Sequence, residues 1–461
     1  MRQVKKSRSK RNKRKHDKKD LSTLKQINLN AAGIDVGAES HFVAVPEGRD
    51  LEGRSVRKFS SFTADLYALA DWLKSCDIET VAMESTGIYW IPLFETLESR
   101  GFEVHLVNPR NIKNVPGRKT DVVDCQWIQQ LHTYGLLRGA FRPNDEICVL
   151  RSFLRQRSML VSCASTHILH MQKALDQMNV KLHQVVSDIT GATGMRIIHA
   201  ILDGELNPNE LAKLRDVRCK NDEATIALAL QGNWRSEHLF SLQQAIELYE
   251  VYQAKIADCD AKIQAHLETF EDRTNGDQLK KPAKKKKRNK NDPVFDAQTL
   301  LYKMCGVDLT HIEGINVLTA LVIISEIGLD MSLWPTEKHF ASWLGLSPGS
   351  KISGGKILSS KTKPSANRVA TALRLSANSL YRNSSALGAF FRRKKAQLGA
   401  PKAITATAHK LAKLIYNMLK YGKEYIDQGQ DYYEQRYKER VVKNLQRRAK
   451  ELGFQLTELT V

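Results

Sequence analysis

The sequence predicts an α/β domain followed by two mainly helical regions, and three patterns in its 461 residues support this fold class. Short apolar runs alternate with helical periodicity over residues 29–145, which is typical of a sheet with flanking helices. Over residues 146–270, apolar residues recur at alternating steps of four and three, as in paired helices. Residues 297–461 are again helical in pattern, except for a glycine-rich stretch at 345–356.

Five strands and three helices are expected in the first domain, with three strands in a meander before helices and strands alternate. The strands are placed at 29–36, 41–45, 55–59, 80–83 and 103–107. The helices are placed at 63–74, 88–100 and 120–133. Thr63 and Thr120 are expected to cap the first and third helices, and Gly101 to end the second. The pattern predicts a mixed sheet, with a basic loop at 110–119.

Four acidic residues occupy the strand and helix ends of this domain. Asp35 lies in the first strand and Glu84 ends the fourth, while Asp121 and Asp124 share one face at the start of the third helix. A buried carboxylate needs a neutralising partner, and Mg²⁺ (or Mn²⁺) prefers hard oxygen ligands. Two such ions about 4 Å apart could clamp a phosphodiester. The alternatives are that Asp35 faces solvent and that the helical pair only complements the helix dipole.

These acids lie in segments that resemble a known family. The segments are Gly-Ile-Asp-Val-Gly at 33–37, Glu-Ser-Thr-Gly-Ile-Tyr at 84–89, Asn-Pro at 108–109 and Lys-Thr-Asp-Val-Val-Asp at 119–124. In this order they resemble the Asp-Glu-Asp-Asp transposases of the IS110 insertion-sequence family. The resemblance implies a first domain like RuvC, a Holliday-junction resolvase with an RNase H fold. It also implies a catalytic divalent-metal site made of Asp35, Glu84, Asp121 and Asp124.

The helical pattern of residues 146–270 predicts either an intermolecular coiled coil or two helices paired within one chain. In the second arrangement, the two helices run antiparallel and residues 181–240 form an insertion at the tip. Arg157 interrupts the apolar seam once. The resemblance favours an assembly role, because the family has a coiled coil after the RuvC-like domain, and it implies a homo-oligomer (dimer or tetramer).

The C-terminal glycine-rich stretch contains a candidate nucleophile. The resembling family carries a nucleophilic serine before a glycine and shortly after Gly-Leu-x-Pro, which here corresponds to Ser353. From the residues alone, a serine in such a loop is usually a turn residue. Ser347 and Ser350 lie too early for that alignment. Lys351 and Lys356 flank Ser353 and could neutralise a phosphate.

Downstream of this stretch the chain departs from the family pattern. Family members usually show Lys-x-Gly-Asn, whereas this chain has Lys-Pro-Ser-Ala-Asn-Arg at 363–368. The departure leaves Ser353 in place but makes the roles of Lys363 and Arg368 less defined. A separate stretch at 312–318 resembles a helix-hairpin-helix turn, whose backbone amides can meet a DNA phosphate, and 189–195 is a weaker match.

A formal net charge of +21 indicates a polyanionic partner, and nucleic acid fits better than a membrane surface. A basic tail at 1–28 and a linker at 271–296 separate the expected domains, and their Lys/Arg-rich parts, 1–20 and 280–290, supply 17 of these charges. The candidate nucleic-acid-binding residues are Arg110, Lys113, Arg118, Lys119, Lys351, Lys356, Lys363 and Arg368. Seven scattered cysteines without a C-x-x-C motif predict no disulfide framework and no zinc site. With no secretory leader or membrane-spanning run, a cytoplasmic, nucleoid-associated protein is expected.

The sequence therefore predicts a DNA transposase-recombinase. The resemblance implies a serine–DNA covalent intermediate, donor and target DNA as substrates, and a structured bridge RNA that pairs with both. It also implies that the two halves of the site come from different protomers. Two alternatives stay open. One is a Mg²⁺-dependent RuvC-like endonuclease in which Ser353 is structural, and the other is a non-catalytic nucleic-acid scaffold.

Overall fold

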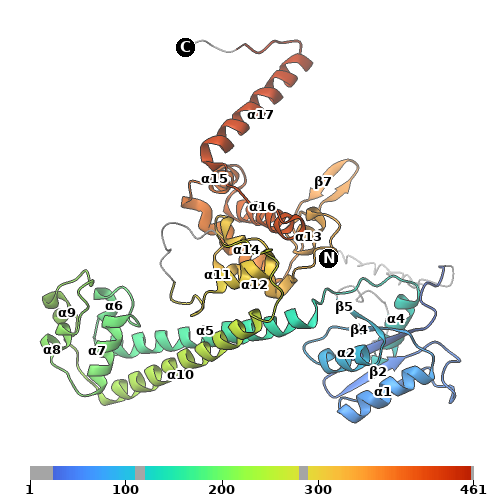
Figure 1. The fold of residues 1–461 in the computed structure, drawn as a ribbon, viewed down its shortest axis with the longest axis horizontal. Coiled ribbons are helices and arrows are strands. Elements are labelled where there is room, and N and C mark those ends of the chain that lie inside the picture. The colour runs from blue at the N-terminus through green and yellow to red at the C-terminus, as the bar shows by residue number, and fades with distance from the viewer. Residues whose placement is uncertain (1–23, 110–119, 280–288, 458–461) are drawn as a thin grey trace, which may run out of the picture. The chain divides into compact units, whose positions relative to one another are not determined.

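The structure is a computed structural model that describes residues 24–109, 120–279 and 289–457. The chain divides into two compact units, Met1–Arg142 and Pro143–Val461. Figure 1 labels many of the elements of both units, and each unit is considered by itself. No helix among the described residues is long and apolar enough to cross a membrane.

The first unit is built on a five-stranded sheet with the order β3-β2-β1-β4-β5. Its strands are β1 (Ala31–Val36), β2 (Ser40–Ala44), β3 (Val56–Ser60), β4 (Thr80–Glu84) and β5 (Glu103–Val107). β1, β2 and β3 form an antiparallel meander, while β1, β4 and β5 are parallel. The parallel pairs need helical crossovers, which the intervening helices provide. The expected mixed sheet is confirmed, and its order and strand directions are those of an RNase H-like fold.

Helices cover both faces of this sheet. They are α1 (Thr63–Ser75), α2 (Trp90–Ser99) and α4 (Asp121–Thr133). Alternate residues of β1 point to opposite faces. Ile34 and Val36 join the core formed with α1 and α2, whereas the other face meets α4. Thr120 caps α4 as expected, because its side chain accepts the Val123 N–H.

The start of α1 differs from the expectation at one residue. The N-cap is Phe62, with no side-chain capping hydrogen bond, so the prediction that Thr63 caps this helix is wrong. Thr63 is already the first helical residue, and a cap must precede the helix. Ser60 takes part of this role, since its hydroxyl accepts the Phe62 N–H at 3.2 Å.

Gly33 allows α4 to lie directly on β1. A Cβ atom at Gly33 would lie 2.2 Å from the Gln129 backbone nitrogen and 2.5 Å from the Cys125 carbonyl oxygen. Both neighbours are backbone atoms of a packed helix, so they cannot rotate away as a side chain would. The close contact therefore requires glycine at this position.

We expect Gly33→Ala to lower the free energy of unfolding of the first unit by about 3 kcal/mol, because overpacking against fixed atoms is costly. The measurement is the urea midpoint of the first unit's transition, followed by circular dichroism. Gly139→Ala is the matched control, because its nearest neighbour, His105 Nδ1, would lie 3.9 Å from the new Cβ. An equal loss in both variants would contradict the proposed role of the Gly33 contact.

Two long helices, α5 (Asp145–Gln177) and α10 (Ser236–Leu267), form an antiparallel hairpin at the start of the second unit (Figure 1). The direction follows from two contacts: His266 Nε2 lies 2.8 Å from the Glu146 carbonyl oxygen, and Arg157 pairs with Asp260. The seam residues are buried in this pairing, so the structure has the intramolecular alternative. Arg157, which interrupts the seam, is only 3% exposed and donates to both oxygens of Asp260.

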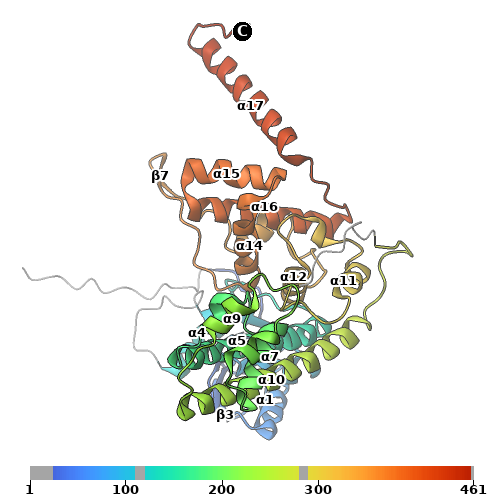
Figure 2. The same ribbon diagram turned by 90° about the vertical axis from the view of Figure 1, so that its left-hand side faces the viewer.

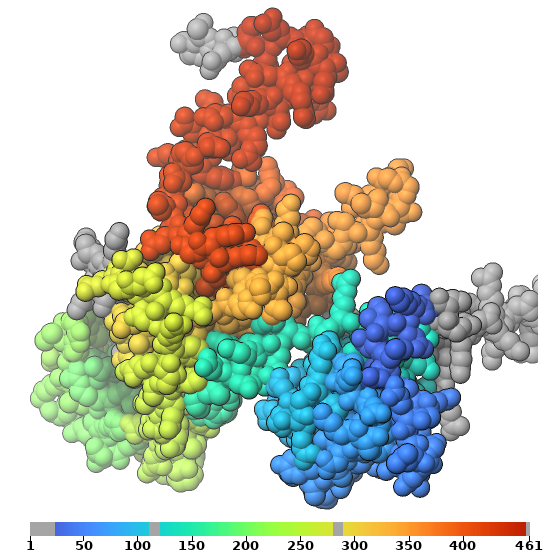
Figure 3. Space-filling model, turned by 45° about the vertical axis from the view of Figure 1, so that its right-hand side comes forward, coloured from blue at the N-terminus to red at the C-terminus, as the bar shows by residue number. Residues whose placement is uncertain are grey.

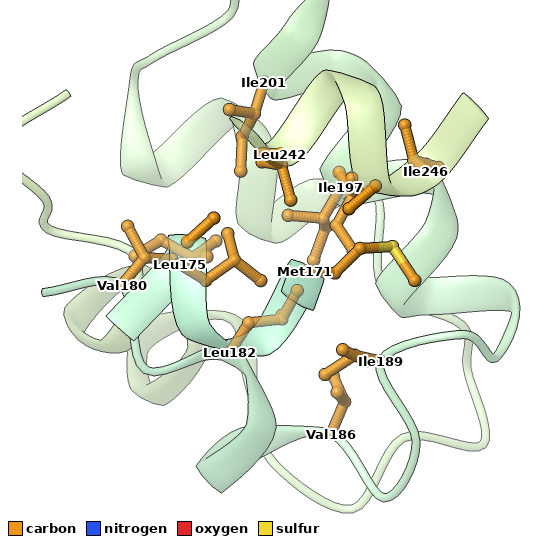
Figure 4. Close-up of a cluster of buried hydrophobic side chains, with 14 of the residues drawn as sticks. Met171, Leu175, Val180, Leu182, Val186, Ile189, Ile197, Ile201, Leu242 and Ile246 are labelled. Carbon is orange, nitrogen blue, oxygen red and sulfur yellow. The ribbon is translucent and has the colours of Figure 1, made fainter. Parts of the chain in front are cut away.

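The segment between these helices closes the end of the hairpin. It contains α6 (Leu182–Val185), α7 (Ala192–Leu202), α8 (Pro208–Lys213) and α9 (Glu223–Ala229). Figure 4 shows Ile197 and Ile201 of α7 packed with Met171 of α5 and Leu242 of α10. The expected insertion at the tip is thus a small helical cap that shares one apolar core with the hairpin.

The rest of the second unit is mainly helical. Its helices are α11 (Ala297–Cys305), η1 (Leu309–His311), α12 (Val317–Ile327), α13 (Glu337–Trp343), α14 (Arg368–Ser379), η2 (Leu380–Arg382), α15 (Ala386–Leu398), α16 (Ala400–Tyr421) and α17 (Gly429–Glu451). α16 packs against α13, α14 and α15, and Figure 2 shows α15 lying along it. Its fully buried Tyr416 donates a hydrogen bond to the Trp334 carbonyl oxygen at 2.6 Å.

The glycine-rich stretch is a β-hairpin, so the expectation of a loop is wrong. β6 (Lys351–Ser353) pairs antiparallel with β7 (Lys356–Ser359). Gly354 and Gly355 connect them with φ of 54° and 75°, and this positive φ at both positions is what a two-residue hairpin turn needs. In Figure 3 the hairpin stands out from the surface in orange.

Candidate active site

Asp35 and Glu84 lie on the sheet face that α4 covers. Gly33 contacts α4, and strand alternation places Asp35, two residues later, on the same face. On β4, Ala82 packs with Ile128 of α4, so Glu84 shares that face. β1 and β4 are in register with Ile34 beside Met83. At the next position on each strand, Asp35 therefore lies beside Glu84.

The direction of α4 brings its first turn to the same end of the sheet. The Gln129 side-chain amide donates to the Ala31 carbonyl oxygen at 3.4 Å, near the start of β1. Cys125, one turn earlier on α4, is near Gly33 in mid-strand. The helix therefore runs antiparallel to β1, and Asp121, four residues before Cys125, lies toward the end that carries Asp35.

The buried Cys125 thiol lies near two of these acids. Its pKa is raised to about 12, mainly by burial and to a smaller extent by the negative charges of Asp35 and Asp124. Its sulfur lies 3.2 Å from the Val122 carbonyl oxygen. Residues that are 89 positions apart in the sequence thus act on one buried group, which supports a common acidic corner.

The donor chemistry of this corner suits a hard divalent cation, because all four side chains offer carboxylate oxygens. Within residues 24–109, 120–279 and 289–457, no three His, Cys, Asp or Glu side chains surround one point closely enough to hold a metal. The backbone arrangement brings the strand ends and the helix start together. Binding an ion here would require the carboxylates to turn toward one another.

The structure adds supporting residues that the sequence interpretation did not assign. Thr86 Oγ1 donates to a Glu84 carboxylate oxygen at 3.1 Å, and Ser85 Oγ donates to the Val107 carbonyl oxygen of β5 at 3.1 Å. Both occur in the Glu-Ser-Thr-Gly segment, so the motif itself could have indicated them. His41 on β2 is also buried, and its Nδ1 has no partner among the described residues, but it pairs with Val36 on the opposite face of the sheet and so does not join the acidic corner. Nothing in the local sequence indicates this histidine.

Ser353 lies on one face of the β6–β7 hairpin with Lys356. Lys356 is its cross-strand partner, and directly paired residues share a face. Lys351 lies two residues earlier on the same strand, but the register shifts between Lys351 and Ile352, so strand alternation does not assign Lys351 to that face. All three residues are exposed. The hairpin presents a hydroxyl beside an ammonium group, an arrangement suited to a phosphate.

The other predicted nucleic-acid-binding residues fall into two groups. One group lies outside the described residues: Arg110, Lys113, Arg118 and Lys119. In the other, Lys363 is exposed, while Arg368 Nε lies 4.0 Å from a Glu326 carboxylate oxygen. Glu326 also pairs with Arg155, so Arg155 already compensates part of the negative charge of Glu326.

The two predicted helix-hairpin-helix stretches do precede helices. Asn316 caps α12 by accepting the Thr319 N–H, and Gly191 is the N-cap of α7. Gly314 has φ of 88°, and a Cβ there would lie 2.9 Å from the Ser376 carbonyl oxygen. Gly314 is thus explained by packing on α14, and a phosphate-binding role stays a prediction.

An RNase H-like sheet with acids at one end of its central strands, followed by a mainly helical unit, is typical of enzymes that process DNA strands. A family model described as a transposase, named for the Asp-Glu-Asp-Asp enzymes of IS110, matches residues 32–180. A second family model, described as the transposase IS116/IS110/IS902 family, matches residues 308–392. The chain belongs to the IS110 family of transposases. No individually curated protein matches it.

Proposed function

We propose that this transposase cleaves and rejoins DNA through a covalent link to Ser353, assisted by a divalent metal at the acidic corner. The observation that carries the proposal is that Asp35, Glu84 and the first turn of α4 meet at one end of the sheet. Ser353 supports it from the second unit, because it is exposed and pairs with Lys356 across the hairpin.

The serine chemistry conserves the number of phosphoester bonds. The Ser353 hydroxyl attacks a backbone phosphorus and gives up its proton, and the departing DNA oxygen takes one up. The new serine phosphodiester keeps the bond energy, so a DNA hydroxyl can later displace the serine without ATP. Lys351 and Lys356 would neutralise the charge that develops on the phosphoryl oxygens during both steps.

The acidic corner would hold Mg²⁺ (or Mn²⁺) through Asp35, Glu84, Asp121 and Asp124. When bound, such an ion supplies charge neutralisation at the scissile phosphate. The chain's own part is to fix the carboxylates: the β1–β4 register aligns two of them, and Thr120 fixes the start of the helix that carries the others.

The proposed partners are donor and target DNA, a structured bridge RNA and further copies of the chain in a dimer or tetramer. The RNA would select sequence by base pairing, while the protein contacts shape and backbone. Acids and serine belong to two separate compact units, Met1–Arg142 and Pro143–Val461. A site shared between protomers requires that its two halves lie in separate compact units, so that each half can come from a different copy of the chain.

We expect Ser353→Ala to lose both recombination and the protein–DNA adduct while keeping its fold, because the change removes one oxygen from an exposed hairpin. The measurement is a denaturing gel with labelled donor DNA, beside a recombination assay. Ser347→Ala and Ser350→Ala should both form the adduct. Ser353→Cys should retain at most a trace, because a thiolate is a nucleophile of different geometry.

Two outcomes would contradict the serine mechanism. Adduct formation by Ser353→Ala would show that another nucleophile acts. Wild-type protein that nicks DNA with Mg²⁺ and leaves free ends, with Ser353→Ala behaving alike, would instead indicate a RuvC-like endonuclease in which this serine is structural.

A further inference from the structure

The helix α17 is exposed along most of its length. None of its 23 residues is fully buried, although Tyr433 and Tyr437 near its start contact α15. Between Arg436 and Lys450 it has seven basic residues and only one acidic residue, Glu439. Most helices of a folded protein bury one side in a core. A helix without a fully buried residue needs another explanation for its charge.

Five of the basic residues form one stripe. They follow steps of four, three, four and three, which keeps side chains on a single helix face, and they are Arg436, Arg440, Lys443, Arg447 and Lys450. At 1.5 Å per residue the stripe is about 21 Å long. An ion pair joins Arg447 of the stripe to Glu451 at 3.7 Å, and both side chains are at least 66% exposed, so water largely screens it.

A second set of cations lies where α17 meets α15 and α16. The guanidinium of Arg393 lies 3.9 Å from the Tyr437 ring centre, and the Lys410 ammonium lies 5.4 Å from that of Tyr433. Burial lowers the pKa of Lys410, and the charges of Arg393 and Arg440 lower it further, against the opposing effect of Asp427. Arg440, one of the stripe residues, therefore acts electrostatically on Lys410.

The cluster has donors without acceptors. Arg393 Nε and the Tyr433 hydroxyl are buried atoms with no hydrogen-bond partner among the described residues. Unpaired buried donors beside clustered cations are costly. An anion would relieve both costs, since it accepts hydrogen bonds and offsets the repulsion between the cations.

We propose that α17 is a docking helix for the phosphate backbone of duplex DNA, with the stripe lying along one strand and starting beside the Arg393–Lys410 cluster. Charge complementarity favours a polyanion as the partner. The choice of DNA rests on the family assignment and on the function proposed above. Arg436 at the start of the stripe contacts the Tyr432 ring, but no aromatic residue lies between Arg440 and Lys450, whereas single-strand sites alternate cations with stacking rings. A duplex backbone is therefore the better match.

A second copy of the chain is the competing occupant. The side of α17 away from the stripe carries the exposed apolar residues Val442, Leu445 and Leu452. Pairing through them would place two cationic helices side by side, which like charges disfavour. DNA binding places opposite charges together, so the observations favour DNA.

The test compares two double variants of the full chain with equal charge change. Lys443→Gln with Arg447→Gln removes one lysine and one arginine from the stripe. Lys438→Gln with Arg448→Gln removes the same pair from other faces of the same exposed helix. Binding to a duplex of about 30 base pairs is measured by fluorescence anisotropy, without divalent metal, between about 0.05 and 0.3 M KCl.

We expect the stripe variant to bind roughly 30-fold more weakly at about 0.15 M salt, with a salt slope lower by about 2, because two phosphate contacts are lost. The control should change by only a few fold. Equal losses of DNA affinity in both variants would contradict the proposal that the stripe is the DNA-binding face of α17. Unchanged DNA binding with a shifted oligomer mass in the stripe variant would assign α17 to a protein interface. A loss confined to duplex RNA would overturn the choice of DNA.

This result is separable from the serine mechanism. The assay contains no metal and no chemistry, so Ser353→Ala should bind duplex DNA like the wild type in either case. Failure of the serine mechanism would leave the difference between the two double variants in place. Failure of the docking helix would leave the adduct assay unaffected at saturating DNA.

Discussion

Asp35→Asn is expected to reduce strand cleavage by roughly a thousandfold or more, because a bound cation contributes several kcal/mol to phosphoryl transfer. The amide keeps the size of the side chain but loses the charge that holds the ion. DNA binding should stay near normal, since this residue lies in the acidic corner and not in a basic segment.

A second measurement detects the metal without using activity. Mg²⁺ or Mn²⁺ should raise the Tm of the wild type by binding the folded state, and Asp35→Asn should lose most of this rise. Asp71→Asn is the control, because Asp71 is an exposed acid that pairs with Arg100 in the same unit. Near-normal cleavage by Asp35→Asn or by Asp124→Asn would show that the four-acid site is wrong.

Asp260→Ala is expected to lower the free energy of unfolding of the second unit by about 3–5 kcal/mol. Asp260 is 1% exposed, and its Oδ1 accepts a hydrogen bond from Arg157 Nε at 2.5 Å. It also accepts the Val294 N–H at 3.1 Å, while Arg157 donates to the Asn291 carbonyl oxygen at 3.1 Å. Removing the carboxylate leaves a buried guanidinium without its counter-charge.

The matched control removes both charges. Arg157→Met with Asp260→Leu should regain most of the lost stability, because two apolar side chains can replace a buried ion pair at little cost. Urea denaturation followed by helical circular dichroism measures both variants, with the second unit's transition fitted separately. If the double variant were as unstable as Asp260→Ala, lost packing and not the unpaired charge would explain the effect.

The acidic corner was predictable in its parts. Strand periodicity placed Asp35 and Glu84 at strand ends, and Thr120 marked the start of the helix that carries Asp121 and Asp124. These are local properties, since they depend on side-chain alternation and on a cap three residues from its donor. The close approach of α4 to β1 is different. It depends on Gly33 meeting backbone atoms of residues about 90 positions later, which no local pattern specifies.

The glycine stretch shows how a local pattern was misread. Gly354 and Gly355 indicate a turn, but three- and four-residue strands are too short to show alternation clearly. Pairing across the turn decides the outcome. It is supported at the base by the bond from Gly349 N–H to the Lys361 carbonyl oxygen at 3.0 Å.

By itself, the sequence determined the fold class, the succession of strands along the chain and the acids that lie on or next to them. Each depends on short-range periodicity or residue type. Only the tertiary structure decided that α5 pairs with α10 inside one chain, and that Arg157 meets Asp260 103 residues away. It also paired Ser353 with Lys356 across a hairpin. Such contacts depend on chain segments meeting in space, and periodicity describes each segment alone.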